Sequence, residues 1–341
     1  MYHFRNDYGE SAHPEVLAAV CATNDASWPG YGGDECCRRA ADLIRETCGA
    51  PGADVQFLIG GTQTNFTALC AFLRPWEGIL SPSTGHINGH EAGAVEATGH
   101  KIIAVPTGME GKLTPAQILP VLAEYEHAHT VRPRLVYISN STESGMIYTK
   151  DELMALSRCC RRHGLLLYLD GARLGYALAS RHNDLTLPDL ARLTDAFYIG
   201  GTKNGALFGE ALVIVNPALQ TDFFRLKKQR GAVLAKGWLL GAQFEALLKN
   251  DLYFSLAKHA NEMAERLQEG LRAMGWAFLA DTPTNQIFPI VEHALLPKLS
   301  TLCTYETWCP WDEGRTVIRF VTSFSTKQEA VDGLLRQLGN L

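Results

Sequence analysis

Short apolar runs alternate with amphipathic helical stretches over most of the chain. Several of these runs are rich in β-branched or aromatic residues and are apolar on both faces, as strands covered by helices on both sides are. Strand–helix alternation of this kind predicts an α/β fold with a mainly parallel sheet. The expected strands are Val55–Ile59, Lys101–Val105, Arg134–Ser139, Leu165–Leu169, Ala196–Ile199 and Glu210–Val215.

Capping signals mark where helices begin between these strands. Thr114 stands before Pro115, and threonine followed by proline is typical of an N-cap and a first helical position. Thr149 and Glu152 have the spacing of a capping box just before an apolar-periodic stretch. We therefore predict that helices begin at both places.

The pattern changes around residue 245. A long helical stretch from Asp251 to Met274 leads to separated strands at Asn285–Ile290 and Val317–Val321. A capping box at Thr326 to Glu329 predicts a closing helix. We expect a large α/β domain and a smaller C-terminal α+β domain, with the chain divided into an N-terminal segment 1–25, a large domain 26–249 and a small domain 250–341.

Composition excludes several classes of partner. The chain has 341 residues, a net charge of −5 and scattered basic residues, so nucleic acid is not an expected partner. No stretch approaches the roughly 18 apolar residues of a membrane span. The start, Met1 to Glu15, lacks the apolar run of a signal peptide, which predicts a cytoplasmic protein. Nine cysteines without a C-x-x-C pair predict reduced thiols and no bound metal.

One apolar strand ends at Asp170, and Arg173 follows three residues later. In an open α/β sheet, ligands bind beyond the carboxyl ends of the strands. A carboxylate buried there needs a cation, a metal or a donor, and a protonated pyridine nitrogen would satisfy it. The planar fork of Arg173 suits a substrate carboxylate. A structural Asp170–Arg173 ion pair and a Mg²⁺ ion at Asp170 are alternatives that this stretch leaves open.

A second strand end carries Lys203 in a turn that runs from Gly200 to Gly205. A lysine that is desolvated there has a lowered pKa and can act as a Schiff-base nucleophile. The glycines let a cofactor approach the backbone closely. The order of residues does not fit a phosphate-binding P-loop, whereas an ordinary solvated loop lysine stays possible.

Two further stretches carry weaker signals. A strand passes through Gly60 and Gly61 into a helix at Thr62, which is the arrangement of an anion site, although such junctions also occur for packing. His86 lies in a glycine-flanked stretch and could stack on an aromatic cofactor or move a proton. Most single histidines are ordinary polar residues, and the same holds for His129.

Together these stretches resemble the threonine aldolase / β-eliminating lyase family of fold-type I pyridoxal-phosphate enzymes. The similarity covers nearly the whole chain, and it looks closest to the low-specificity and phenylserine-type aldolases. The pair Asp-Gly-Ala-Arg and Thr-Lys-Asn-Gly at this separation is specific. The matching motifs are Asn6-Asp7, Tyr31–Glu35, Gly61-Thr62, His86-Ile87, Thr142–Gly145, Asp170–Arg173, Thr202–Gly205 and Arg319–Phe324.

The resemblance implies a role for each matching residue. Lys203 would carry pyridoxal phosphate as a Schiff base, Asp170 would keep the pyridine nitrogen protonated, and His86 would stack on the ring. His129 would meet the substrate hydroxyl. The implied cofactor-binding residues are Gly60, Gly61, Thr62, His86, Asp170, Arg173, Thr202, Lys203 and Lys228, and the implied substrate-binding residues are Asn6, Tyr31, Arg173 and Arg319.

The implied reaction is cleavage of the Cα–Cβ bond of L-threonine, L-allo-threonine or a related β-hydroxy amino acid, giving glycine and an aldehyde. His86, His129 or a water would take the hydroxyl proton. The family also implies a homodimer or homotetramer with shared active sites. A β-eliminating lyase acting on another amino acid and a catalytically idle cofactor-binding protein are the alternatives.

Two positions depart from the family pattern. Asn6 stands where serine is frequent, so the carboxylate contact there can differ. Trp238 stands where an arginine can reach a cofactor phosphate across the subunit interface. Lys228 or Lys236 could supply the missing charge.

Overall fold

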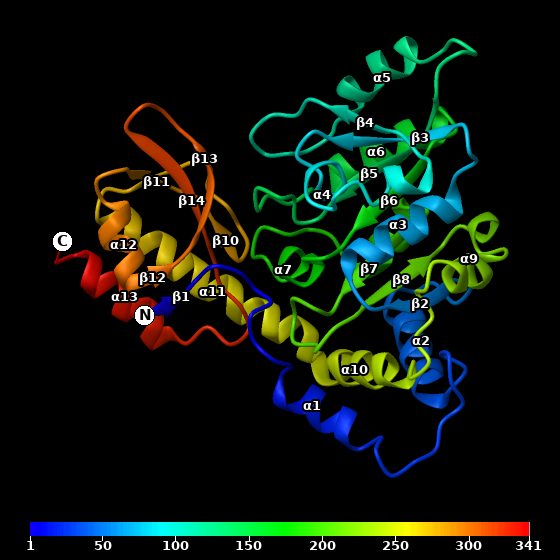
Figure 1. Cartoon of the computed structure of the whole chain (residues 1–341), viewed down its shortest axis with the longest axis horizontal. Helices are drawn as coiled ribbons and strands as arrows, with labels where there is room; N and C mark the ends of the chain where they lie inside the picture. The colour runs from blue at the N-terminus through cyan, green and yellow to red at the C-terminus, as the bar shows by residue number, and fades with distance from the viewer. Residues whose placement is uncertain (341) are drawn as a thin grey trace.

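A seven-stranded sheet forms the centre of the computed structural model, which describes residues 1–340 (Figure 1). The strand order is β2-β8-β7-β6-β5-β3-β4, and only β8 runs antiparallel to its neighbours. The predicted α/β fold with a mainly parallel sheet is thus confirmed. The strands are β2 Asp54–Leu58, β3 Glu77–Pro82, β4 Ile102–Val105, β5 Arg132–Ser139, β6 Leu166–Asp170, β7 Ala196–Gly200 and β8 Glu210–Ile214.

The sequence prediction lacks one of these strands, β3. Its residues include glutamate, glycine and proline, which are depleted in strands. All six positions are nevertheless buried, and β3 pairs in parallel with both β4 and β5. Burial and pairing with two neighbouring strands stabilise β3, so the strand propensity of its residues does not predict it.

Helices cover both faces of the central sheet (Figure 1). Each face of the sheet packs into its own apolar cluster. Phe197 and Ile199 of β7 belong to one cluster, and Tyr198 belongs to the other. The predicted helix starts are confirmed, because capping boxes at Thr114 and Thr149 open α5 and α6. The helices around the sheet are α1 Pro14–Cys21, α2 Glu35–Thr47, α3 Gly61–Phe72, α4 His86–Gly89, α5 Pro115–Glu124, α6 Lys150–Arg162, α7 Leu174–Leu178, α8 Leu187–Leu193, α9 Phe223–Gln229 and α10 Trp238–Leu248, with short 3₁₀ turns at Glu96–Thr98, Pro217–Leu219 and Lys249–Asp251.

The C-terminal part packs a smaller sheet against the long helix α11. Strands β10, β14, β11 and β9 form this sheet in that order, and β13 also pairs with β14. The predicted long helix is confirmed as α11. The elements are α11 Leu252–Ala273, β9 Ala277–Phe278, β10 Gln286–Ile287, β11 Pro289–Glu292, α12 Leu296–Leu302, β12 Cys303–Thr304, β13 Glu306–Pro310, β14 Arg315–Val321 and α13 Gln328–Leu338.

The N-terminal residues of the chain pack against this C-terminal part. Strand β1, Tyr2–His3, pairs in parallel with β12, and Phe4 is buried in the same apolar cluster as Phe320. The capping box expected at Thr326 is wrong: α13 starts at Gln328, and the Thr326 hydroxyl instead accepts a hydrogen bond from the backbone of Ser323 at 2.8 Å. Within residues 1–340, none of the helices has the length and apolarity that crossing a membrane requires.

Candidate active site

The carboxyl ends of β6 and β7 place Asp170 and Lys203 in one region. Asp170 is the last residue of β6, and β7 ends at Gly200 before the turn that carries Lys203. A Cβ on Gly200 would lie 2.6 Å from the carbonyl oxygen of Ala172, so only glycine lets these two strand ends approach so closely. The predicted convergence of the aspartate and the lysine is therefore present in the fold.

Lys203 is held in a state that favours reaction. Burial lowers its pKa, and the positive charge of Arg173 acts in the same direction. The carboxylates of Asp7, Glu143 and Asp170 oppose this shift without cancelling it. A lysine with a lowered pKa has a larger fraction of neutral amine, which is the form that attacks a carbonyl.

Asp170 accepts four hydrogen bonds and forms no ion pair with a residue of the described chain. The hydroxyl of Tyr198 (2.5 Å) and the backbone N–H of Ala172 (3.0 Å) donate to Oδ1. The hydroxyl of Tyr137 (2.6 Å) and Nδ2 of Asn65 (2.9 Å) donate to Oδ2. Each carboxyl oxygen of Asp170 thus has two donors in a buried setting. The site offers a fixed carboxyl group with which a protonated ring nitrogen would pair.

Arg173 pairs with Asp7, so the alternative of an Asp170–Arg173 ion pair is wrong. Nε and Nη2 of Arg173 donate to the two carboxylate oxygens of Asp7 at 2.8 and 3.0 Å. Asn285 Nδ2 donates to the same carboxylate at 3.0 Å. Although burial acts to raise the pKa of Asp7, the charges of Arg173 and Lys203 hold it below its usual value. This ion pair fixes the plane of the Arg173 guanidinium.

A second guanidinium lies near Arg173. Arg319 on β14 donates from Nη1 to Oε1 of Gln286 at 3.3 Å, and its guanidinium lies 5.3 Å from the ring centre of Trp308. Burial and the nearby charge of Arg173 lower the pKa of Arg319. Two guanidinium groups of like charge in one region attract an anion, as expected for a substrate carboxylate. Asn6, which precedes Asp7 in the chain, is half-buried.

The first turn of α3 supplies the expected anion site. Its N-cap, Gly60, has no side chain to cap the helix, so the first backbone N–H groups stay available to a phosphate. A Cβ on Gly61 would lie 3.2 Å from the hydroxyl of Tyr198, which shows that this turn adjoins the Asp170 network. Thr62 is exposed in the same turn. The Thr202 hydroxyl accepts from the backbone N–H of Gly209 at 2.9 Å, so it also closes the lysine turn.

His86 belongs to the same network through residues that the sequence analysis missed. Its Nδ1 lies 2.8 Å from Oε1 of Glu91, and that oxygen also accepts from Nδ2 of Asn65 at 2.8 Å. Burial acts to lower the pKa of His86, but the hydrogen bond to Glu91 raises it, and the net direction is upward. A spacing of five residues matches no common motif, so the sequence carries no signal for this pair.

His129 does not join these residues within one protomer. It is exposed in the connection before β5, whereas Ser139, which ends β5, lies opposite Asp170 in the sheet. The eight residues of β5 are separated by seven rises of about 3.3 Å, so the two ends of the strand lie roughly 23 Å apart. The structure therefore places His129 near the amino ends of the parallel strands, whereas Lys203 lies at their carboxyl ends.

Tyr31 and Lys228 lie together on the surface. Nζ of Lys228 is 4.4 Å from the ring centre of Tyr31, and both residues are exposed. The backbone N–H of Tyr31 donates to the carbonyl of Ala235 at 3.0 Å, which places Tyr31 beside the segment with Lys236 and Trp238. Among residues 1–340, neither side chain makes a hydrogen bond or ion pair with Asp170, Arg173 or Lys203.

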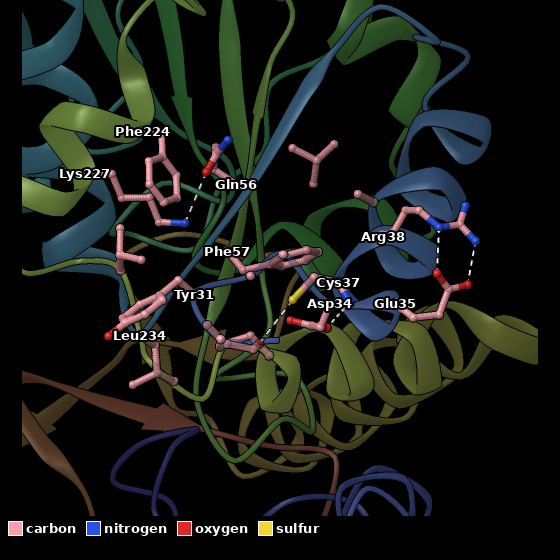
Figure 2. Close-up of a pocket in the computed structure, with 18 of the residues that line it drawn as sticks. Tyr31, Asp34, Glu35, Cys37, Arg38, Gln56, Phe57, Phe224, Lys227 and Leu234 are labelled. Atoms are coloured by element: carbon pink, nitrogen blue, oxygen red, sulfur yellow. Dashed lines mark hydrogen bonds and ion pairs between the residues drawn. The ribbon is translucent and has the colours of Figure 1, made fainter. Parts of the chain in front are cut away.

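A cavity of about 600 Å³ opens beside Tyr31 (Figure 2). Phe57, Leu234 and Lys227 also line it, and Nζ of Lys227 donates to Oε1 of Gln56 at 3.1 Å. Burial lowers the pKa of Lys227 to about 8. The residues that line this cavity do not include Lys203 or Asp170, so it is separate from the site at the strand ends.

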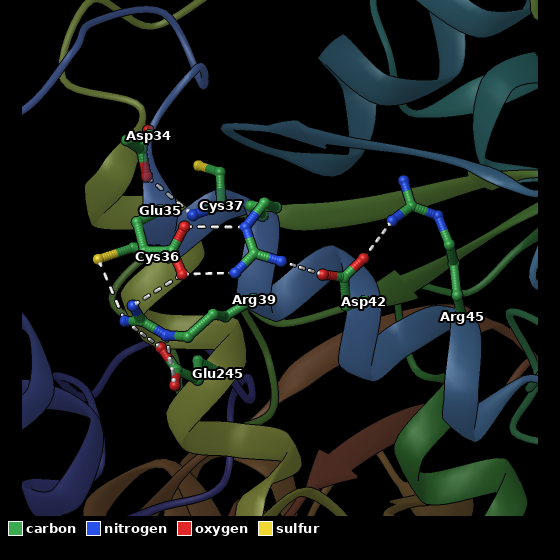
Figure 3. Close-up of polar contacts among 9 residues, drawn as sticks. Asp34, Glu35, Cys36, Cys37, Arg39, Asp42, Arg45 and Glu245 are labelled. Atoms are coloured by element: carbon green, nitrogen blue, oxygen red, sulfur yellow. Dashed lines mark hydrogen bonds and ion pairs between the residues drawn. The ribbon is translucent and has the colours of Figure 1, made fainter.

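Helices α2 and α10 hold the wall of this cavity in place (Figure 3). Asp34 caps α2 by accepting from the backbone N–H of Cys37 at 2.8 Å. Arg39 on α2 forms an ion pair with Glu245 on α10 at 2.9 Å. This contact links the segment around Tyr31 to the helix that begins at Trp238.

Comparison with known proteins agrees with this geometry. The family model described as "Beta-eliminating lyase" matches residues 11–294. A low-specificity L-threonine aldolase of Pseudomonas aeruginosa is 32% identical over 300 residues, which cover 87% of this chain and 84% of that protein. The structure of a threonine aldolase from Leishmania major matches with a TM-score of 0.98 and 47% identity, over 100% of this chain and 99% of that one.

More distant structures share the fold alone. An aspartate aminotransferase variant of Thermus thermophilus is 15% identical and has a TM-score of 0.73 over 100% of this chain. The family model and the two closer relatives confirm the resemblance that the sequence motifs carry. The chain therefore belongs to the β-eliminating lyase family, a family of pyridoxal-phosphate-dependent lyases.

Proposed function

We propose that this chain is an aldolase that cleaves the Cα–Cβ bond of L-threonine, L-allo-threonine or a related β-hydroxy-α-amino acid, giving glycine and an aldehyde. One observation carries the proposal. Lys203, with its lowered pKa, shares the strand-end region with the hydrogen-bonded carboxyl group of Asp170 and the guanidinium groups of Arg173 and Arg319. Relatives named threonine aldolases support the substrate class.

The residues present fit pyridoxal phosphate. Lys203 would hold the aldehyde carbon, and Asp170 would pair with the protonated ring nitrogen. Gly60, Gly61 and Thr62 would hold the phosphate at the start of α3, because the backbone donors there have no side-chain cap. When bound, this cofactor supplies an electron sink for a bond to Cα that stands perpendicular to its ring.

Arg173 and Arg319 orient the substrate. Their guanidinium groups would bind its carboxylate, with Asn6 beside them, and Asp7 keeps the Arg173 fork in one plane. The position of the carboxylate decides which bond to Cα is perpendicular to the cofactor ring, so these residues select the reaction. His86 would take the proton from the β-hydroxyl group as the Cα–Cβ bond breaks.

Tyr31 and Lys228 would serve the active site of a second copy of the chain. Both are exposed, they contact each other, and none of their hydrogen bonds or ion pairs within residues 1–340 reaches Lys203. A homodimer or homotetramer with shared sites would bring Lys228, or Lys236, to the phosphate where Trp238 replaces the family's arginine. His129 would also need a partner copy to reach a substrate. We further propose a cytoplasmic location and no nucleic-acid partner, which fractionation and filter binding test.

An absorbance spectrum tests the central proposal. Protein with added pyridoxal phosphate should show a visible band that borohydride reduction changes and that Lys203→Ala removes. The same preparation should release glycine and an aldehyde from L-threonine, L-allo-threonine or phenylserine. A band without glycine release would keep the cofactor and discard the aldolase in favour of a β-eliminating or idle protein. No band would overturn the proposal.

A further inference from the structure

Glu91 is a buried carboxylate to which the proposed reaction gives no part, and it makes a direct contact with His86. We propose that Glu91 is a positioning residue: it holds the His86 imidazole through Nδ1, so that Nε2 is left to exchange a proton with the β-hydroxyl of the substrate. The identity of that substrate rests on the proposed function. The contact itself is a property of the fold.

The contact fixes the tautomer of His86. Nδ1 lies 2.8 Å from Oε1 of Glu91. An ionised carboxylate can only accept hydrogen bonds, so the proton of a neutral imidazole must be on Nδ1. Nε2 then carries the lone pair that a general base needs. The Glu91 side chain is fully buried whereas that of His86 is 32% exposed, so the ring is anchored inside and is accessible from outside.

Asn65 holds Glu91 in turn. Its Nδ2 carries two hydrogens, one for Oε1 of Glu91 at 2.8 Å and one for Oδ2 of Asp170 at 2.9 Å. Its Oδ1 accepts from the hydroxyl of Tyr168 at 3.1 Å. The reversed amide would point its oxygen at two carboxylates, so only one orientation satisfies the network. The side chain of Asn65 therefore links Glu91, the partner of His86, to Asp170, which would pair with the ring nitrogen.

The charge of Glu91 sets when His86 can act as a base. Oε2 of Glu91 is buried and has no hydrogen-bond partner among residues 1–340, and the hydrogen bond between Oε1 and the imidazole raises the pKa of His86. His86 also faces Glu143 and Asp170, which raise its pKa, and Lys203, which lowers it. The ring of His90 lies 5.6 Å away, centre to centre. Only Glu91 acts through a hydrogen bond.

The proton transfer balances without a further reactant. The β-hydroxyl proton moves to Nε2 of neutral His86 while the oxygen forms a carbonyl to the β-carbon. As the Cα–Cβ bond breaks, the bound cofactor would supply the sink for its electron pair. The aldehyde leaves, and Glu91 stabilises the imidazolium until its proton is transferred to Cα of the glycine. Cleavage therefore needs neutral His86 and should fall at low pH.

Glu91→Gln tests the proposal, because glutamine keeps the size of the side chain and an acceptor for Nδ1 but removes the charge. Two midpoints are measured: the titration of His86 by NMR in the protein without cofactor, assigned with His86→Asn, and the acidic limb of log kcat/KM for glycine release. Both should move to lower pH together, by about one unit. Glu91→Asp keeps the negative charge on a shorter side chain and should shift the two midpoints less.

Two further variants are matched controls. Glu143→Gln removes a carboxylate that reaches His86 only through space and should shift the titration less. Glu96→Gln removes an exposed carboxylate of the same segment and should not shift it. A folded Glu91→Gln protein whose His86 titration and acidic limb stay in place, with the rate lowered at every pH, would overturn the proposal. If the wild-type protein releases no glycine, the proposed function fails, but the NMR titration still decides the role of Glu91.

Discussion

Asp7 accepts two hydrogen bonds from Arg173, at 2.8 and 3.0 Å, although the two residues are 166 positions apart in the chain. The bonds use Nε and Nη2, so Nη1 and the outer edge of the guanidinium stay available for a substrate carboxylate. Asp7 follows β1, which pairs with β12 of the C-terminal part, whereas Arg173 follows the central strand β6. The contact thus joins the two parts of the molecule at the carboxylate site.

Asp7→Asn should weaken substrate binding and stability together. Asparagine keeps the shape, but it leaves the guanidinium of Arg173 buried without a counterion. Breaking one partner of a buried pair costs about 3–5 kcal/mol, so the melting temperature should fall by several degrees or more. KM for the amino acid should rise roughly tenfold or more, with a smaller change in kcat, because the fork loses its fixed plane.

Steady-state kinetics and calorimetry measure both effects. Glu306→Gln is the matched control, since it removes one partner of the exposed Arg5–Glu306 pair, and such pairs contribute little. The pKa of Asp7 is held below its usual value, so its stabilising contribution is present at neutral pH and is lost as the pH falls through the acid range. An unchanged KM in Asp7→Asn would show that Arg173 does not depend on this contact.

Asp170→Asn should lower kcat by about 10- to 150-fold, which corresponds to the roughly 1.5–3 kcal/mol of a hydrogen bond to a charged group. The amide has no negative charge to keep a ring nitrogen protonated. The visible band of the bound cofactor should also change, because its electronic state depends on that proton. Asp184→Asn is a suitable control, because within residues 1–340 that carboxylate accepts a hydrogen bond from the backbone of Lys150 and from no other group. A normal rate and spectrum in Asp170→Asn would remove Asp170 from the site.

The local patterns of the sequence predicted the strand ends but not the contacts between them. Asp170 and Lys203 each follow an apolar strand, and the parallel sheet necessarily brings such ends to one edge. The partners Asp7, Glu91 and Asn65 come from separate segments, and no periodicity connects them with the residues that they hold. Tertiary contacts alone determine those pairings.

Tertiary contacts also explain the two features that local patterns predicted wrongly or missed. The predicted capping box at Thr326 fails because the hydroxyl closes a turn with Ser323 instead. Strand β3 was missed because burial between two strands stabilises residues of low strand propensity. The role of His129 stays a prediction, because a match to a motif position does not show at which end of the strands, or in which copy, the side chain lies.

Glu210→Gln should remove a pH dependence from the stability of the protein. Burial raises the pKa of Glu210 to about 8, although its hydrogen bond with Thr202 and the charge of Lys203 act to lower it. Its folded pKa lies above the ordinary value of 4.5, so its stabilising contribution is complete below about pH 4.5 and is lost as the pH rises to about 8. Ionised Glu210 would also face the Lys203 turn, where its Oε2 accepts from the N–H of Gly201 at 3.0 Å.

The difference in melting temperature between the wild-type protein and Glu210→Gln isolates this effect, because the other groups cancel. The glutamine variant should gain stability relative to the wild type between pH 5 and 8, by up to a few kcal/mol. Glu245→Gln is the control, since the pKa of that carboxylate is lowered and its trend with pH is opposite. A constant difference across this range would contradict a protonated Glu210.

Hybrid oligomers decide whether Tyr31 and Lys228 serve the partner's site. One chain carries Lys203→Ala, and a second carries Tyr31→Ala with Lys228→Ala. Each variant alone should be inactive or strongly impaired, because every site lacks either the cofactor lysine or the phosphate-facing pair. In a mixed dimer, one site collects all the substitutions and the other has none. Co-expression with two affinity tags should therefore restore up to half of the wild-type activity per dimer. If all these residues served one site within a protomer, both sites of the hybrid would stay defective and no activity would return.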